Sequence, residues 1–252
     1  MAIWAFSDLH LALGNPAKTM ARFPGWENYV EKIEQAWREV VVDGDLVLVA
    51  GDISWASKLE EVETDLRWLD SLPGKKVLSN GNHDYWWSSE KKMNTFLKER
   101  QFKSIHFLFN TPFIWKDQII IAGTRLWDSE EYSFGAFIDY KANSAEREKV
   151  DDREHDRAIF KREIEKLARN LAPLKGSSLK KIAMLHYPPI NAALSPSQAS
   201  AILESAGIDL AIFGHLHSVR KGALPFGTKN GVTYLLTSAD YIDFNPLLLL
   251  NL

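Results

Sequence analysis

The chain has 252 residues, 46% of them hydrophobic and 25% charged, a composition typical of a globular protein with one large core. Its formal net charge of −3 does not favour duplex nucleic acid as a partner, because tight binding to a duplex depends on neutralising phosphates with Lys and Arg. The lack of cysteine excludes disulfides and thiolate metal sites and fits the reducing cytoplasm, where we expect the protein. We find no signal-peptide pattern and no apolar run near the ~20 residues that span a bilayer, so we expect no membrane association.

Strands and helices are predicted to alternate through the first hundred residues. Short apolar runs indicate buried strands, and apolar residues at helical spacing follow each of them. The predicted strands are residues 2–6, 45–51 and 75–79, and the predicted helices cover about 26–42, 58–71 and 89–99. Pro73 and Gly74 end the second of these helices.

The middle of the chain is rich in predicted strands, and the remainder returns to alternation. Further strands are predicted at 104–109, 112–116, 118–123, 180–186, 208–214, 231–238 and 247–251, and further helices at about 156–171 and within 195–207. A hairpin turn is expected at Lys116-Asp117, and Ser195 or Ser197 is the expected cap of the last helix. A charged segment at 128–157 is read as an exposed insertion. The pattern predicts one α/β domain over residues 1–252, with layered sheets.

Residue types that bind metals follow nearly every predicted strand of the alternating parts. In open α/β sheets, ligands bind beyond the carboxyl ends of the strands. The strand ends carry Asp8 and His10, Gly51 and Asp52, Asn82-His83-Asp84, His186, and Gly214-His215-Leu216-His217. Residues two apart in an extended segment project to the same side, so His215 and His217 should point together. Five of the chain's 7 histidines lie at these ends, which indicates a shared site.

Each motif also has a simpler structural explanation when it is taken alone. Gly-Asp after a strand is typical of a turn or a helix cap, and His186 alone would fit an ordinary strand end. The pair His215 and His217 is harder to explain structurally, because crowding two imidazoles brings a fold no advantage. His106 and His155 are read as structural or solvated, since His155 lies in a charged run.

Taken in order, the strand-end motifs resemble those of the calcineurin-like metallophosphoesterase superfamily. The resemblance spans residues 8 to 217 and implies a four-layer αββα sandwich, with two mixed β-sheets flanked by helices and two divalent metal ions at the strand ends. The implied metal ligands are Asp8, His10 and His217 for one ion, Asn82, His186 and His215 for the other, and Asp52 as the bridge. The resemblance further implies that His83 is the catalytic histidine and not a ligand.

The chemistry of these side chains agrees with the implied site. Imidazole, carboxylate and amide groups suit divalent Mn, Fe or Zn. A bridging carboxylate can hold two ions ~3.5–4 Å apart, where they would activate a shared hydroxide for in-line attack on a phosphomonoester or phosphodiester. His83 would act as the general acid toward the leaving oxygen, and Asp84 would orient its imidazole.

Departures from the family's branches bear on the substrate. The Asp-Arg-Gly sequence that usually follows Gly-Asp in protein Ser/Thr phosphatases is absent, because the second motif continues as Ile53-Ser54-Trp55. Arg125 follows a predicted strand and is the candidate clamp for a substrate phosphate, since a guanidinium fork matches phosphate oxygens. Its alternative is a surface arginine paired with Asp128 or Glu130.

Several alternatives stay open at this point. Tyr85, Trp86 and Trp87 either stack on a planar part of the substrate or pack between sheet and helix. Asp240 and Asp243 are read as parts of a turn. The expected substrate is a small phosphorylated molecule, with nucleotides among the candidates. The alternatives are a metal-dependent nuclease and a catalytically silent scaffold of the same fold, and the oligomeric state is left open.

Overall fold

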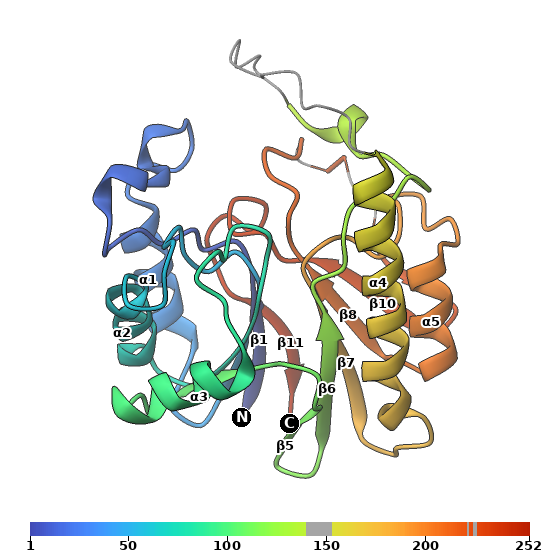
Figure 1. The fold of residues 1–252 in the computed structure, drawn as a ribbon, viewed down its shortest axis with the longest axis horizontal. Helices are drawn as coiled ribbons and strands as arrows, with labels where there is room; N and C mark the ends of the chain where they lie inside the picture. Colours follow the sequence, from blue (N-terminus) through green and yellow to red (C-terminus); the bar gives the residue numbers. More distant parts are fainter. Residues whose placement is uncertain (140–152, 221, 224–225) are drawn as a thin grey trace.

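Two β-sheets lie face to face between two groups of helices (Figure 1). The computed structural model describes residues 1–139, 153–220, 222–223 and 226–252. Each sheet combines parallel and antiparallel strands, and both chain termini lie at the same end of the sandwich. The four-layer αββα arrangement with two mixed sheets is therefore confirmed.

The first sheet has five strands in the order β11-β1-β2-β3-β4. Its strands are β1 (Ala2–Phe6), β2 (Leu46–Ala50), β3 (Lys75–Ser79), β4 (Ile105–Phe107) and β11 (Leu247–Asn251). The strands β1 to β4 are parallel, and β11 runs antiparallel to β1. The helices on its outer side are α1 (Tyr29–Val40), α2 (Glu63–Ser71) and α3 (Glu90–Glu99).

The second sheet has six strands in the order β5-β6-β7-β8-β10-β9. Its strands are β5 (Phe113–Trp115), β6 (Ile119–Thr124), β7 (Lys180–Leu185), β8 (Leu210–Phe213), β9 (Thr228–Lys229) and β10 (Val232–Leu236). The helices on its outer side are α4 (Arg153–Leu171) and α5 (Gln198–Ala206). Four short 3-10 helices among the described residues are η1 (Pro16–Lys18), η2 (Met20–Arg22), η3 (Gly135–Phe137) and η4 (Ala172–Leu174).

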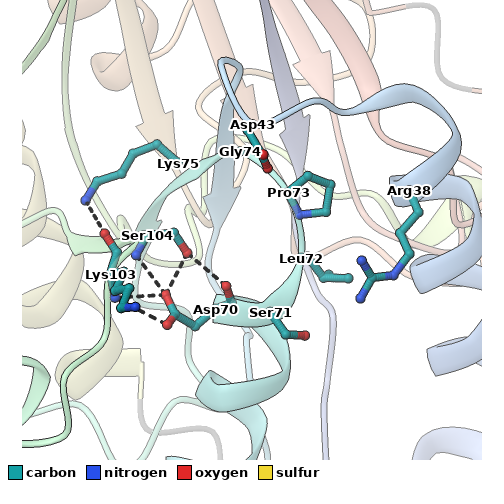
Figure 2. A pocket seen from close by; sticks show the side chains of 10 residues that line it. All are labelled: Arg38, Asp43, Asp70, Ser71, Leu72, Pro73, Gly74, Lys75, Lys103 and Ser104. Carbon is teal, nitrogen blue, oxygen red and sulfur yellow. Dashed lines mark hydrogen bonds between the residues drawn. The ribbon is translucent and has the colours of Figure 1, made fainter.

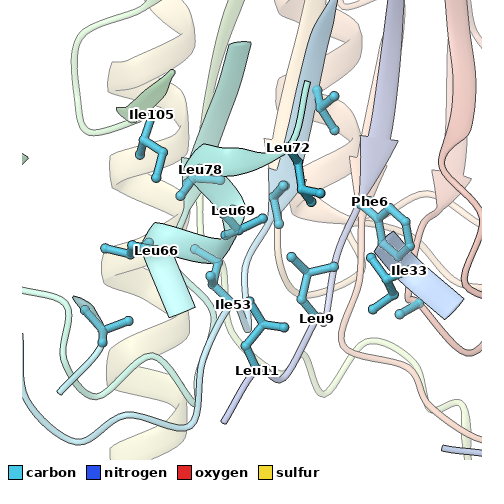
Figure 3. Packing of buried hydrophobic residues seen from close by; sticks show 14 of the residues in the cluster. Phe6, Leu9, Leu11, Ile33, Ile53, Leu66, Leu69, Leu72, Leu78 and Ile105 are labelled. Atoms are coloured by element: carbon cyan, nitrogen blue, oxygen red, sulfur yellow. The ribbon is translucent and has the colours of Figure 1, made fainter. Parts of the chain in front are cut away.

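The alternation of side chains along each strand builds the layers. In β2, Val47 and Val49 join the cluster packed under α1, α2 and α3, part of which is shown in Figure 3. Leu48, between them in the sequence, packs instead with residues of the second sheet such as Met184. A strand that is buried on both faces needs an unbroken apolar run, which explains why the sequence reads LVLVA there.

A hairpin turn and a helix cap lie where local features of the sequence predict them. Lys116 and Asp117 both have positive φ, 49° and 53°, as the two central residues of a type I′ turn require, and they lie in the connection that joins β5 to β6 in an antiparallel hairpin as predicted. The cap of α5 is Ser197, whose side chain accepts a hydrogen bond from the backbone N–H of Ser200. Ser195 is not the cap.

The predicted charged segment at 128–157 is only partly described. Residues 140–152 lie outside the described residues. Residues 128–139 form a loop that contains η3, and α4 begins at Arg153, three positions earlier than the predicted helix. No helix among the described residues is long and apolar enough to cross a membrane.

The parallel strands of both sheets end at the same rim of the sandwich. Just beyond β1, the backbone N–H of Ser7 donates to the carbonyl of Thr237 (2.9 Å), and the carbonyl of Ser7 accepts from Ala239 (3.1 Å). These bonds join the end of β1 in the first sheet to the end of β10 in the second. The loops that carry the polar motifs therefore meet at one rim.

The opposite rim has a cavity of its own. A cavity of about 510 Å³ lies at the amino-terminal ends of β3 and β4 (Figure 2). Its Asp70 carboxylate accepts hydrogen bonds from the backbone N–H groups of Lys103 and Ser104 and from the Ser104 hydroxyl. These hydrogen bonds hold α2 to the loop before β4. The cavity therefore lies at the opposite ends of the strands from the predicted metal ligands.

Candidate metal centre

The first group of predicted ligands converges just beyond β1 and β8. His10 Nε2 and His217 Nε2 are 3.0 Å apart, and His217 Nε2 is 3.4 Å from Asp8 Oδ1. One ligand atom from each of these three residues lies within 4.8 Å of the others. Residues more than 200 positions apart thus point their donor atoms at a common point.

The second group converges beyond β3, β7 and β8. The amide oxygen of Asn82 is 2.7 Å from His186 Nε2 and 3.1 Å from His215 Nδ1. On the far side of the His186 ring, Nδ1 lies 3.1 Å from the carbonyl oxygen of Ala50, which fixes the orientation of the imidazole. The structure therefore brings these three predicted ligands together.

Asp52 lies between the two groups. Its Oδ2 is 3.7 Å from His10 Nε2, and its Oδ1 is 3.5 Å from His186 Nε2. Each carboxylate oxygen therefore faces a histidine of a different group, as a bridging ligand would. Asp8 also approaches the second group, since ligand atoms of Asp8, Asp52 and His186 lie within 4.8 Å of one another.

The backbone is contorted where it presents these side chains. Asp8, His10, Asp52 and His215 all have positive φ, between 46° and 72°, a conformation that costs energy for residues with a Cβ. The tight turns aim each side chain back toward the rim between the sheets. Such backbone strain is concentrated at functional sites in proteins.

Two motif glycines are explained by the close approach of ligand carboxylates. A Cβ at Gly81 would collide with the carboxylate of Asp52, and a Cβ at Gly214 would collide with that of Asp8. The glycines of the Gly-Asn-His and Gly-His-Leu-His motifs thus leave room for the acidic ligands of other strands.

Electrostatic interactions within the first group favour the charged forms of Asp8 and His217. Burial alone would raise the pKa of Asp8, but the hydrogen bond and charge of His217 outweigh it and hold that pKa far below its usual range. Burial likewise works against a charged His217, yet its hydrogen bonds to Asp240 and Asp8 raise the pKa of His217 well above its ordinary value. Without metal ions, the positive charge of protonated His217 therefore balances negative charge of the carboxylates in this group.

The remaining ligands are shifted toward their neutral forms. Burial, joined by the charges of Asp8 and Asp84, raises the pKa of Asp52. Burial lowers the pKa of His186 to about 4 and also lowers the pKa values of His10 and His215. Neutral imidazoles are the form that binds metal, so three of the four predicted histidine ligands are ready to bind.

Comparison with known proteins identifies the family to which this arrangement belongs. The model of the calcineurin-like phosphoesterase family matches residues 1–219, which include all the strand-end motifs. The chain belongs to this family. Its domain is accordingly of the kind that forms metal-dependent phosphoric ester hydrolases.

Individual relatives are distant or partial. A probable rhamnogalacturonate lyase C of Emericella nidulans is 34% identical over 83 residues, which make up 32% of this chain but only 7% of that protein. A structure of a protein of unknown function from Aquifex aeolicus covers 98% of this chain and 95% of its own, with 17% identity and a TM-score of 0.48. Another solved structure, 14% identical with a TM-score of 0.53, covers 92% of this chain and 88% of its own and shares the fold.

The donor set of this phosphoesterase fits two divalent ions. Carboxylate oxygens, imidazole nitrogens and one amide oxygen face one another at 2.7–3.7 Å across a largely buried site. Imidazole and oxygen donors suit borderline and hard ions such as Zn, Fe and Mn. Asp8, His10 and His217 would hold one ion, Asn82, His186 and His215 the other, and Asp52 both.

His83 lies beside the first group without joining it. Its backbone N–H donates to Asp52 Oδ1 (2.9 Å), and its ring centroid is 5.6 Å from that of His10. The indole of Trp55 packs against both imidazoles, with its ring centroid 4.3 Å from that of His83 and 5.0 Å from that of His10. This position at the edge of the ligand cluster is compatible with a role toward a bound substrate.

Asp84 contacts the neighbouring loops rather than only its own segment. Its Oδ1 accepts from the backbone N–H groups of Ile53 and Ser54 and from the indole of Trp86, and its Oδ2 accepts from the backbone N–H of Gly81. These bonds fasten the Gly-Asp loop to the Gly-Asn-His-Asp loop. Orientation of the His83 imidazole by Asp84 stays a prediction.

Asp240, which the sequence analysis assigns to a turn, contacts one of the predicted ligands. Its Oδ1 is 2.8 Å from His217 Nδ1, and its Oδ2 accepts from the backbone N–H of Ser218 at 2.8 Å. It thereby orients the His217 ring toward the first group. Its position just after β10, at the same rim as the other motifs, is the feature that could have pointed to this contact.

The aromatic residues after His83 divide between packing and exposure. Trp86 is buried and Trp87 partly buried, and both pack against Phe107 between β4 and α3, as one alternative predicted. Tyr85 is 64% exposed beside His83, so its ring is open to a substrate at the centre. His106 packs on Phe113 away from the site, in agreement with a structural role.

Arg125 follows β6 as predicted. Its carbonyl oxygen accepts hydrogen bonds from the backbone N–H groups of His186 and Tyr187, at 3.1 and 2.9 Å. Its guanidinium stacks on Trp127, 4.6 Å from the ring centroid. The alternative of a surface ion pair does not hold for Glu130, which instead pairs with Arg157 at 2.9 Å.

Proposed function

We propose that the protein hydrolyses a phosphomonoester or phosphodiester of a small molecule, with nucleotides among the candidates, using two divalent ions at the strand ends. The observation that carries this proposal is the position of Asp52, whose two oxygens face His10 in one group and His186 in the other. A carboxylate shared between two histidine groups is the arrangement that a dinuclear phosphoesterase requires.

When bound, the two ions would polarise the phosphoryl oxygens and make hydroxide available near neutral pH. The chain's own contribution is to fix the reacting groups. Asp240 and the Ala50 carbonyl orient the imidazoles of His217 and His186, so the donor atoms need little rearrangement.

His83 is the proposed general acid. Asp52 holds its backbone through a hydrogen bond, and Trp55 packs on its ring, so the imidazole is placed beside the ligand cluster. From there a protonated imidazole would donate its proton to the leaving oxygen as the ester bond breaks.

Location in the cytoplasm, expected from the lack of cysteine, stays a prediction.

The test uses protein loaded with Mn²⁺ and assayed with p-nitrophenyl phosphate and bis-p-nitrophenyl phosphate. We expect turnover of at least one of the two, its loss on adding a chelator, and its loss in Asp52→Asn. The control variant is His155→Ala, which changes an exposed histidine on α4 and should keep full activity. Turnover that survives both the chelator and Asp52→Asn would refute the proposal.

A further inference from the structure

A second cavity lies next to the candidate metal centre. It has a volume of about 340 Å³ and lies between the carboxyl ends of β3 and β6 and one face of α4. Its charged lining residues are Arg125, Arg162, Glu163, Lys166 and Arg169. Four positive groups and one negative group give this pocket a charge opposite in sign to the net −3 of the chain.

The basic side chains of this cationic pocket come from two elements. Arg162, Lys166 and Arg169 are four and then three positions apart on α4, so they share one face of the helix. Arg125 approaches from the end of β6, with its guanidinium held against Trp127. The fold thus gathers positive charge on both sides of one hollow.

The arginines of the pocket are not neutralised by the part of the chain that the structure describes. Within that part, no carboxylate lies within 4.0 Å of the guanidinium of Arg125, Arg162 or Arg169. Glu163, the acidic residue among the described lining, accepts from the Thr124 hydroxyl and lies 4.0 Å from Lys166. The guanidinium groups are therefore available to an anion from outside, and their planar forks match phosphate oxygens.

The pocket shares two strand ends with the metal centre. Asn80 lines it, two residues before the candidate ligand Asn82. Arg125 also lines it, and its carbonyl accepts from the backbone N–H of His186, another candidate ligand. A ligand that fills the pocket would consequently lie beside the Asn82 and His186 side of the centre.

We propose that the cationic pocket binds a second phosphate group of the substrate, while the ester phosphate lies at the metal centre. This inference rests on the proposed function and narrows the substrate class to phosphate esters that carry another phosphate. The arginines of the pocket attract that group. The distance between the pocket and the centre determines how long the molecule that carries the two phosphates must be.

The experiment compares alkanediol bisphosphates of increasing chain length with the alkyl monophosphates of the same length, using the Mn²⁺-loaded protein. We expect kcat/KM for at least one bisphosphate to exceed that of its monophosphate by about tenfold or more, because the second phosphate gains charge-assisted hydrogen bonds in the pocket. In Arg162→Gln/Arg169→Gln this advantage should disappear, chiefly through KM, while the rate with the monophosphate changes little.

The matched control is Lys161→Gln/Lys175→Gln, which removes the same charge from exposed positions outside the pocket. It should keep the advantage of the bisphosphate. The inference is overturned if no bisphosphate is preferred, or if the preference survives in Arg162→Gln/Arg169→Gln. It is also overturned if calorimetry shows that the pocket binds inorganic phosphate while bisphosphates have no advantage. Failure of the proposed function would differ, since the monophosphates themselves would then not be hydrolysed.

Discussion

His217 is held from two sides, and both contacts bear on metal binding. Its Nε2 faces Asp8 and His10, while its Nδ1 lies 2.8 Å from Asp240. A carboxylate on the far ring nitrogen fixes the tautomer and strengthens the imidazole as a ligand. We therefore expect Asp240 to be a positioning residue that acts on a bound metal through His217.

Replacing that carboxylate should weaken the first metal site. We expect Asp240→Asn to lower the Mn²⁺ affinity of one site by about 10- to 100-fold, measured by calorimetric titration. The control is Asp243→Asn, an exposed acid of the same loop, which should bind both ions with unchanged affinity. Equal affinities in Asp240→Asn and the wild type would rule out the positioning role.

The proposed role of His83 depends on the leaving group. In His83→Ala we expect kcat to fall by about 10²- to 10⁴-fold with an alkyl phosphate, whose leaving oxygen needs a proton. With p-nitrophenyl phosphate the loss should be much smaller, because nitrophenolate leaves without protonation. Metal content should stay the same, because His83 is not among the ligands. A similar loss with both substrates would contradict a general-acid role.

Single residues differ in how far the sequence reveals them. The seven predicted ligands could be proposed because metal-binding residue types recur at strand ends in motifs that resemble those of the phosphoesterase family, and the α/β fold brings them together. Asp240 and Trp55 act through contacts with distant residues, His217 and His83, that no local pattern records. For Asp84, adjacency to His83 suggested one partner, whereas its carboxylate bonds to backbone on the neighbouring loop.

At the level of elements, the start of α5 is hydrogen-bonded to the loop that follows the candidate ligand His186. Ser197 accepts from the backbone of Ser200, and its own hydroxyl donates to the carbonyl of Pro189 (2.5 Å) in the loop after His186. We expect Ser197→Ala to lower the free energy of unfolding by about 1–2 kcal/mol, measured by urea denaturation. Ser195→Ala, the control two residues earlier, should cost less than about 0.5 kcal/mol. Equal effects of the two substitutions would show that the cap contributes nothing.

Helix boundaries were less predictable than helix positions. The second helix was predicted from residue 58, but α2 begins at Glu63. Leu59 and Val62 are nevertheless buried in the core, so apolar spacing continues through a turn that is not helical. Hydrophobic periodicity reports which side chains are buried, and burial does not require a helical backbone.

For the whole molecule, the metal centre joins the two halves of the sandwich. Asp8, Asp52 and Asn82 follow strands of the first sheet, whereas His186 and His215 follow strands of the second. An ion held by both sets resists separation of the sheets. With ions bound, we therefore expect the rim to be stabilised by them as well as by the hydrophobic layer between the sheets.

Metal binding should accordingly raise stability. With Mn²⁺ at a hundred times its dissociation constant, each site should add about 2.7 kcal/mol to the free energy of unfolding. The measurement is thermal denaturation with Mn²⁺ and with chelator, repeated on Asp52→Asn, which should lose most of the difference. Identical melting temperatures under the two conditions would mean that the rim does not bind metal in the folded protein.

The most direct test of the dinuclear centre is a crystal structure of the Mn²⁺-loaded protein, with an anomalous difference map recorded at the manganese edge. We expect two peaks on opposite sides of the Asp52 carboxylate, one near His10 and His217 and the other near Asn82 and His186. A single peak, or peaks away from Asp52, would contradict a pair of ions bridged by this residue.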